Sequence, residues 1–302
     1  MDISVIIGSY NQADRLKKVI DAFIRQDVKI EFELIIVDSF STDHTAAMVS
    51  EYDLNTLPFQ LEFIQRENPA GKAEARNVGV HASKSQLIII TDADMIPDEN
   101  FVQSHFNAHK ASNEPCCFEG LAYNLDSYDW PPESLQDLPT QVAKKYNNGD
   151  RLDWYYFLTG NVSFPKSYFN LEKGFSLDFK NYGWEDLELG YRFKKRGLPL
   201  YYLTSAINYH YHIITNEEQV DRKFYMGQSA QIFIKKHPEL KLFLGVNPLS
   251  VMIRKSLSKS GIIFRFISTL KQSRWSFLRS FSYWFQAEFN YLSGLLSLEF
   301  DS

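Results

Sequence analysis

The N-terminal part of the chain alternates short, continuous apolar runs with longer amphipathic stretches. Continuous apolar runs are typical of strands buried on both faces, and apolar residues three and four positions apart are typical of helices. The runs predict strands at 3–7, 32–37, 59–64 and 87–91, and the amphipathic stretches predict helices at 13–25, 44–52 and 72–82. Strands that alternate with helices in this way predict an α/β fold around a mostly parallel, doubly wound sheet.

The pattern is less regular from residue 100 to about 148, where Trp130-Pro131-Pro132 indicates a loop. Beyond this region we expect a strand at 158–164, a helix at 187–196 and a strand at 200–203. After residue 248 the character changes, because basic residues now alternate with aromatic ones. We therefore expect a main domain at 1–220 and a helical C-terminal appendage at 221–302.

The composition of the 302 residues is that of a globular protein, with 44% hydrophobic and 23% charged residues. The net charge of −5 argues against a general nucleic-acid binder. The two cysteines, Cys116 and Cys117, are neighbours and do not form an ordinary structural disulfide, which fits a reducing compartment. The chain shows neither a signal-peptide pattern nor an apolar stretch of about 18 residues. We expect a cytoplasmic protein.

Polar side chains follow three of the predicted strands. Ser9-Tyr10-Asn11 follows the first strand, Asp38 the second, and Asp92-Ala93-Asp94 the fourth. Open α/β sheets bind ligands at the carboxyl ends of their strands, so these side chains predict a nucleotide site. Carboxylates so close together suit a hard divalent cation, which in turn suits a diphosphate. The glycine patterns of dinucleotide folds and of P-loop enzymes are missing from the sequence.

Several short motifs occur in the order found in one enzyme family. Besides those strand ends, they are the segment 71–79, Gly160-Asn161, Gly183-Trp184-Glu185-Asp186 and Tyr209-His210. Over about residues 1–215 the set resembles the family-2 glycosyltransferases of the GT-A fold, most closely the chondroitin-polymerase and galactosyltransferase branch. The resemblance implies an inverting, metal-dependent hexosyltransferase that moves a sugar from a UDP-sugar to a hydroxyl of a glycan, lipid-linked or other glycoconjugate acceptor.

The resemblance also implies roles for individual residues. Asp186, with Glu185 beside it, would be the general base, and the start of a helix would hold its carboxylate ionised. The residues expected to bind the donor nucleotide are Ser9, Tyr10, Asn11, Asp38, Lys72, Arg76 and Asp92. The residues expected to contact the donor sugar or the acceptor are Gly160, Asn161 and Trp184.

The expected metal is Mn²⁺ or Mg²⁺, with Asp94 as its carboxylate ligand. A histidine would complete the ligand set, which favours Mn²⁺. His210 and His212 alternate along an extended segment, so we expect only one of them to face the metal. His210 is the first choice because of its place after Tyr209, and His212 is the reserve.

Two other functions use the same features. A nucleotidyltransferase on a similar sheet would need Asp92 and Asp94 but not Trp184, Glu185 or Asp186. A non-catalytic subunit would bind the sugar nucleotide only. The C-terminal segment has seven basic residues, with aromatic residues between them, at 251–287. This composition suits a peripheral contact with the inner membrane face or an interface with a partner or with a second copy in a homo-oligomer. Packing onto the catalytic domain is a further alternative.

Overall fold

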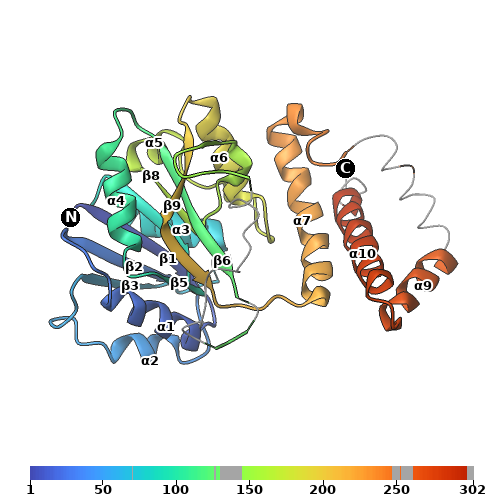
Figure 1. The fold of residues 1–302 in the computed structure, drawn as a ribbon, viewed down its shortest axis with the longest axis horizontal. Helices are drawn as coiled ribbons and strands as arrows, with labels where there is room; N and C mark the ends of the chain where they lie inside the picture. The colour runs from blue at the N-terminus through green and yellow to red at the C-terminus, as the bar shows by residue number, and fades with distance from the viewer. Residues whose placement is uncertain (70, 126, 130–144, 247–251, 253–260, 298–302) are drawn as a thin grey trace. The chain divides into compact units, whose positions relative to one another are not determined.

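The computed structural model describes residues 1–69, 71–125, 127–129, 145–246, 252 and 261–297 (Figure 1). Its contacts divide the chain into two compact units. The first unit comprises Met1–Leu177 and Asp186–Ile213, and the second comprises Asp178–Glu185 and Ile214–Ser302. The expected loop at Trp130-Pro131-Pro132 lies outside the described residues.

The N-terminal half of the sheet has the predicted parallel arrangement. Four strands lie side by side in the order β3-β2-β1-β4, and every neighbouring pair is parallel. The strands are β1 (Ile3–Ser9), β2 (Phe32–Asp38), β3 (Gln60–Gln65) and β4 (Leu87–Asp92). The helices between them are α1 (Ala13–Ile24), α2 (Thr45–Ser50) and α3 (Lys72–Ala82). The sequence prediction of these elements is confirmed to within a few residues at their ends.

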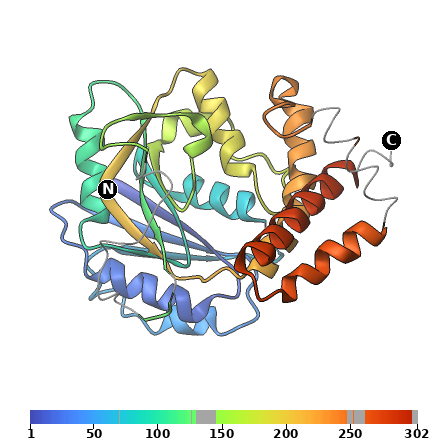
Figure 2. The same cartoon turned by 45° about the vertical axis from the view of Figure 1, so that its right-hand side comes forward.

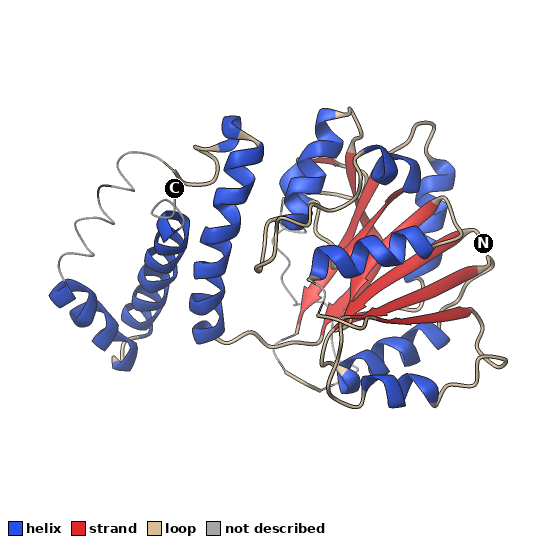
Figure 3. Cartoon of the chain, turned by 180° about the vertical axis from the view of Figure 1, so that it is seen from behind, coloured by secondary structure: helices blue, strands red, loops and turns tan. Residues whose placement is uncertain are grey.

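The C-terminal half of the first unit extends the same sheet with mixed strands, where β8 runs antiparallel to both β4 and β6, and β9 runs parallel to β6. The strands are β5 (Met95–Pro97), β6 (Cys117–Asn124), β7 (Arg151–Leu152), β8 (Asn161–Pro165) and β9 (Leu200–His210). The helices are α4 (Phe101–Ala111), η1 (Trp154–Tyr156), α5 (Lys166–Leu171) and α6 (Glu185–Lys195). Figure 3 shows this sheet with helices against it.

Two predictions for this half were wrong. The irregular region after residue 100 contains helix α4 and strand β6. Strand β9 runs on to His210 instead of ending at residue 203. The register of β9 against β6 shifts between Leu203 and Ile207, where Thr204 and Ser205 interrupt the apolar pattern. A bulge of this kind hides the continuation of a strand from periodicity.

Apolar clusters cover both faces of the sheet. Helices α1, α2 and α4 pack with one cluster, and helices α3, α5 and α6 pack with the other. Helix α3 approaches β1 closely at Gly79, where an added Cβ atom would lie 2.4 Å from Cγ2 of Ile6. This close packing fixes the start of α3, which carries Lys72 and Arg76, relative to the end of β1.

The second unit is helical, as predicted for the C-terminal region. Its described elements are α7 (Asn216–Lys236), η2 (Pro238–Leu240), α9 (Gly261–Thr269), η3 (Leu270–Gln272) and α10 (Ser276–Ser297). Helices α7 and α10 lie side by side (Figure 2). They touch at Gly227 and Gly294, where an added Cβ atom would collide with the backbone of the opposite helix. In the described part of the chain, no helix is both long and apolar enough to span a membrane.

The predicted boundary at residue 220 falls inside α7, whereas the contacts divide the chain before Ile214. Helix α7 begins at a capping box in which the Thr215 side chain accepts a hydrogen bond from the Glu218 backbone and Glu218 reaches back to Thr215. Independent folding of the two units stays a prediction.

Candidate active site

The polar residues at the strand ends meet at one edge of the sheet. In the parallel register, Ser9 lies opposite Asp38, and Gly8 lies opposite Asp92. Ser9 is 3% exposed, and its Oγ atom has no hydrogen-bond partner among the described residues. The carboxyl edge of the parallel strands therefore gathers the predicted nucleotide-binding residues, as the sequence indicated.

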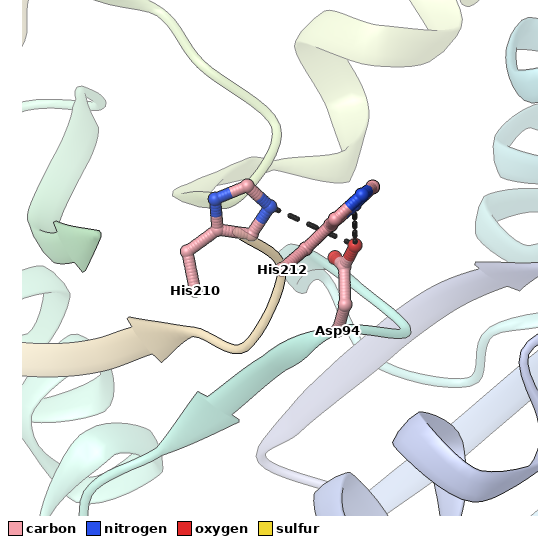
Figure 4. Close-up of side chains that lie close together, drawn as sticks. All are labelled: Asp94, His210 and His212. Carbon is pink, nitrogen blue, oxygen red and sulfur yellow. Dashed lines mark ion pairs between the residues drawn. The ribbon is translucent and has the colours of Figure 1, made fainter. Parts of the chain in front are cut away.

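Asp94 and two histidines form a compact group of metal-type ligands (Figure 4). The Oδ2 atom of Asp94 lies 3.6 Å from Nε2 of His210 and 3.4 Å from Nδ1 of His212. One ligand atom from each of the three residues lies within 4.8 Å of the others. A carboxylate oxygen with two imidazole nitrogens suits Mn²⁺ better than Mg²⁺, which prefers oxygen ligands alone.

The expectation that only one histidine can face this site was wrong. Alternation holds within a strand, but β9 ends at His210 and residues 211–215 have no regular secondary structure. The backbone N–H of Tyr211 donates to the carbonyl oxygen of Asp94 at 2.7 Å, which holds His212 beside the carboxylate. Nδ1 of His210 lies 3.0 Å from Oδ1 of Asn124, and this contact orients the other ring nitrogen toward Asp94.

The Asp94 carboxylate is held in its ionised form. Burial alone would raise its pKa, but the hydrogen bond from His210 and the charges of His210, Lys72 and His212 lower the pKa to about 2. Lys72 is the first residue of α3 and is exposed. Its positive charge acts on the Asp94 carboxylate. An ionised carboxylate beside two imidazoles is a fitting set of donors for a divalent cation.

Asp92 pairs with Arg76. Nη2 of Arg76 lies 2.9 Å from Oδ1 of Asp92, and Arg76 is only 3% exposed. The guanidinium also lies over the ring of Phe175, at 5.7 Å from its centroid. This ion pair fixes Asp92 at the strand end and neutralises its charge close to Asp94.

Asp38 is completely buried, and both of its carboxylate oxygens accept hydrogen bonds from Ser41. In this conformation the side chain shapes its own loop and does not face solvent. Two large aromatic side chains of this region are exposed, Tyr10 at 55% and Phe40 at 44%. Asn11 joins the two loops, because its Oδ1 atom accepts from the backbone N–H of Thr42.

Phe40 is a candidate that the sequence reasoning did not select. It is a large exposed apolar residue with a φ of 67°, a conformation that side chains other than glycine rarely adopt. Asn11, in the neighbouring loop, has a φ of 50°. Unusual backbone angles are frequent at ligand sites. The sequence signal for Phe40 was an aromatic residue two positions after a predicted strand that ends in Asp38.

Asp186 stands in the first turn of α6, next to the buried Glu185. It is half-buried, and its charge contributes to the environment of a second carboxyl group, Glu119 on β6. Burial raises the pKa of Glu119 well above its usual range and the charge of Asp186 adds to this, although the backbone N–H of Leu158 donates to its carboxyl group. Burial and the nearby Asp186 thus both favour the protonated form of Glu119. The sequence analysis missed Glu119 because it lies in the region without a regular pattern.

Trp184 is anchored on helix α7 of the second unit. Its indole N–H donates to the carbonyl oxygen of Met226 at 2.9 Å, and its ring packs against Phe233 with centroids 6.0 Å apart. Gly183 and Trp184 have φ values of 93° and 73°. The segment that leads into Asp186 is thus bent and bound to α7, and the indole N–H of Trp184 is used within the protein.

Gly160 and Asn161 are built into the sheet. The carbonyl oxygen of Gly160 accepts from Thr91 Oγ1 at 2.9 Å and from Asn208 Nδ2 at 2.7 Å. Asn161 is 1% exposed, and its amide donates to the carbonyl oxygen of Ala206 at 2.9 Å. The Asn161 side chain therefore joins strands together and does not face solvent.

A comparison with protein families identifies the chain. The family model described as Glycosyl transferase family 2 matches residues 4–175, which is more than half of the chain. The chain belongs to glycosyltransferase family 2, and the resemblance seen in its motifs is confirmed.

Two curated relatives match most of this chain. Validoxylamine A glucosyltransferase of Streptomyces hygroscopicus subsp. jinggangensis (strain 5008) is 28% identical over 265 residues, covering 79% of this chain and 61% of the relative. Chondroitin synthase of Escherichia coli is 24% identical over 269 residues, covering 78% of this chain and 38% of the relative. The chain thus spans less than two thirds of either relative.

Two solved structures share the fold. Mannosyltransferase PcManGT from Pyrobaculum calidifontis, in complex with GDP-Man and Mn²⁺, has a TM-score of 0.64 at 15% identity and covers 100% of this chain and 88% of that one. S. aureus TarS in complex with UDP has a TM-score of 0.56 at 16% identity and covers 100% and 92%. The predicted GT-A fold is confirmed.

Proposed function

We propose that this protein transfers a sugar from a UDP-sugar to a hydroxyl group of a glycan, lipid-linked or other glycoconjugate acceptor, with inversion at the anomeric carbon. The observation that carries the proposal is the group of Asp94, His210 and His212 at the carboxyl edge of the sheet. Family membership adds the reaction class. Neither the nucleotidyltransferase nor the non-catalytic subunit accounts for this membership together with an intact Asp186.

The metal-binding residues in this proposal are Asp94, His210 and His212, and they would hold Mn²⁺. The chemistry that such a cation supplies is charge neutralisation at the leaving diphosphate. Lys72 adds a positive charge on the same side, as its effect on Asp94 indicates. Asp92, which forms an ion pair with Arg76, would bind the ribose or a water on the cation.

Asp186 is the general base in this proposal. It accepts the proton of the acceptor hydroxyl as that oxygen forms its bond to the anomeric carbon and the bond to the diphosphate breaks on the opposite face. Displacement in one step from the opposite face inverts the anomeric configuration.

We infer that the donor base binds between the loops that carry Tyr10 and Phe40, because these exposed rings offer flat faces for stacking. Asp38 stabilises the loop that carries Phe40, because its carboxylate accepts hydrogen bonds from Ser41. A uridine donor agrees with the UDP bound by TarS, whereas PcManGT binds GDP-Man with Mn²⁺, so the nucleotide needs a direct test. The buried, free cysteines Cys116 and Cys117 support a cytoplasmic site of action.

The test is a screen of sugar nucleotides in the presence of Mn²⁺ that measures the release of free nucleotide. We expect release from one or a few UDP-sugars, and loss of release when Asp94 is replaced by Asn. Release from GDP-sugars alone would contradict the uridine donor. Equal turnover in excess chelator would contradict the role of the metal.

A further inference from the structure

Part of helix α10 has its polar side buried and its aromatic side exposed. Phe277, Phe281 and Trp284 follow each other at helical spacing and are 63%, 44% and 59% exposed. Ser282 and Gln286 lie on the other side of the same turns and are buried. A helix that packs only against its own protein places these two kinds of side chain the other way round. The exposed side of this half of α10 is therefore expected to contact an apolar partner.

The exposed aromatic side chains form two pairs of contacting rings. Trp275 is 57% exposed, and its ring lies 6.1 Å from that of Phe277. Phe281 and Trp284 are in contact as well, with ring centroids 6.0 Å apart. We call these four residues the aromatic face of the second unit. Soluble proteins rarely expose several large aromatic rings together unless the surface binds something.

Arginines accompany the aromatic face. Arg265, Arg274 and Arg279 are exposed, and the stretch from residue 251 to 287 contains no acidic residue. Lys271 is of a different kind, because it lies over the ring of Tyr283 and close to Glu217, so part of its charge is offset within the unit. Among the described residues of this stretch, the three arginines are the exposed basic side chains, in a chain whose net charge is −5.

We propose that the aromatic face lies in the headgroup region of an anionic lipid bilayer. Tryptophan and phenylalanine with adjacent basic residues are typical of helices that lie in the membrane interface. The charges favour a bilayer over a second copy of the chain, because a symmetric contact would bring the same arginines against each other. This binding is independent of the proposed sugar transfer and would hold the enzyme close to lipid-linked acceptors.

The experiment measures binding of the full-length protein to sedimented vesicles, either of phosphatidylcholine alone or with about 30% phosphatidylglycerol added. We expect binding to the anionic vesicles that weakens at high salt, because part of the attraction is electrostatic. Replacing Phe281 and Trp284 by Ser should reduce the partition coefficient at least tenfold. The double variant Arg265→Glu with Arg274→Glu should do so on anionic vesicles only.

A matched control replaces two exposed apolar residues of the first unit, Leu54 and Leu171, which are 61% and 58% exposed. The Leu54→Ser and Leu171→Ser double variant should bind vesicles like the wild type, and all variants should keep the wild-type melting temperature and nucleotide release. Wild-type protein that stays in the supernatant with both vesicle types would overturn the proposal. A dimer in solution that the Phe281→Ser and Trp284→Ser variant dissociates would also overturn it and would make the face an interface between copies.

Discussion

At the scale of single residues, the three-ligand group makes a prediction that differs from the two-ligand group expected from the sequence. His210→Ala and His212→Ala should each weaken Mn²⁺ binding by about tenfold or more, because even outer contacts of a metal site cost about 10–100-fold. The measurement is a Mn²⁺ titration in the presence of UDP. His44→Ala is the matched control, since His44 has an exposed side chain and lies in another loop. Wild-type affinity in His212→Ala would reduce the ligand set to Asp94 and His210.

The general base is tested by a substitution that keeps its shape. Asp186→Asn should lower kcat by about 10²–10⁴-fold, because the amide does not accept the proton of the acceptor hydroxyl. The dissociation constant for UDP should stay within about twofold, since Asp186 does not contact the nucleotide in our proposal. Asp153→Asn, an exposed carboxylate in the same unit, is the control and should retain activity. Turnover near the wild-type rate in Asp186→Asn would assign the base to another group.

The sequence indicated the site at this scale wherever a residue followed a strongly apolar strand. Asp92 and Asp94 were found in this way, because a buried strand has one carboxyl end and its place is set by periodicity. Glu119 was not found, since it is a buried acid on a strand with no clear alternation. His212 was ranked as a reserve because periodicity does not reveal that β9 ends at His210.

At the scale of elements, helix α4 is bound to strand β8 by a buried polar network. Nδ1 of His105 lies 2.8 Å from Oγ of Ser163, and its Nε2 lies 2.9 Å from Oδ1 of Asn161. Nε2 of His109 also lies 2.8 Å from Ser163 Oγ. These polar residues on the buried side of α4 explain why the sequence showed no helical pattern there, whereas the apolar faces of α1 and the buried strands were readily predicted.

This network predicts a pH dependence of stability. Burial lowers the pKa of His105 to about 4, although the hydrogen bond with Asn161 opposes this shift. Between pH 6.5 and about 4 the unfolded chain binds a proton that the folded chain excludes, so the free energy of unfolding falls as the pH falls, by about 3 kcal/mol in total. His105→Gln should be less stable at pH 7 but should lose less of its stability on acidification.

Urea unfolding of the wild type and of His105→Gln at pH 7, 6 and 5 measures this difference. His109 adds to the wild-type slope, because burial and the neighbouring His105 lower its pKa to about 3. His44→Gln, on the surface, serves as the control and should follow the wild type. Parallel curves for the wild type and His105→Gln would show that the network is not the source of the acid sensitivity.

At the scale of the whole molecule, the chain passes between its two units immediately before the proposed base. Residues Asp178–Glu185 belong to the second unit, and Asp186 belongs to the first. Within the second unit this segment is held by Trp184 on α7 and by an ion pair in which Nζ of Lys236 lies 2.6 Å from Oδ2 of Asp178. No local pattern in the sequence predicts that residues 178–185 belong to the second unit, because this depends on contacts between residues about fifty positions apart. Within the second unit, the segment that precedes Asp186 therefore depends on helix α7 for its conformation.

Gly183 offers the sharpest test of this dependence. Gly183→Ala forces a side chain into a φ of 93° and brings its Cβ to 3.0 Å from Cγ of Met226 on α7. Gly197→Ala, at the other end of α6, meets a φ of 80° but no atom within 4 Å. Both variants should lose about 1–2 kcal/mol of stability through the left-handed backbone. Only Gly183→Ala should also lower kcat, because only its added Cβ presses against Met226 and moves the segment before Asp186 away from α7. The affinity for UDP should not change in either variant. Equal kcat in the two variants would mean that the contacts of this segment with α7 have no effect on the reaction.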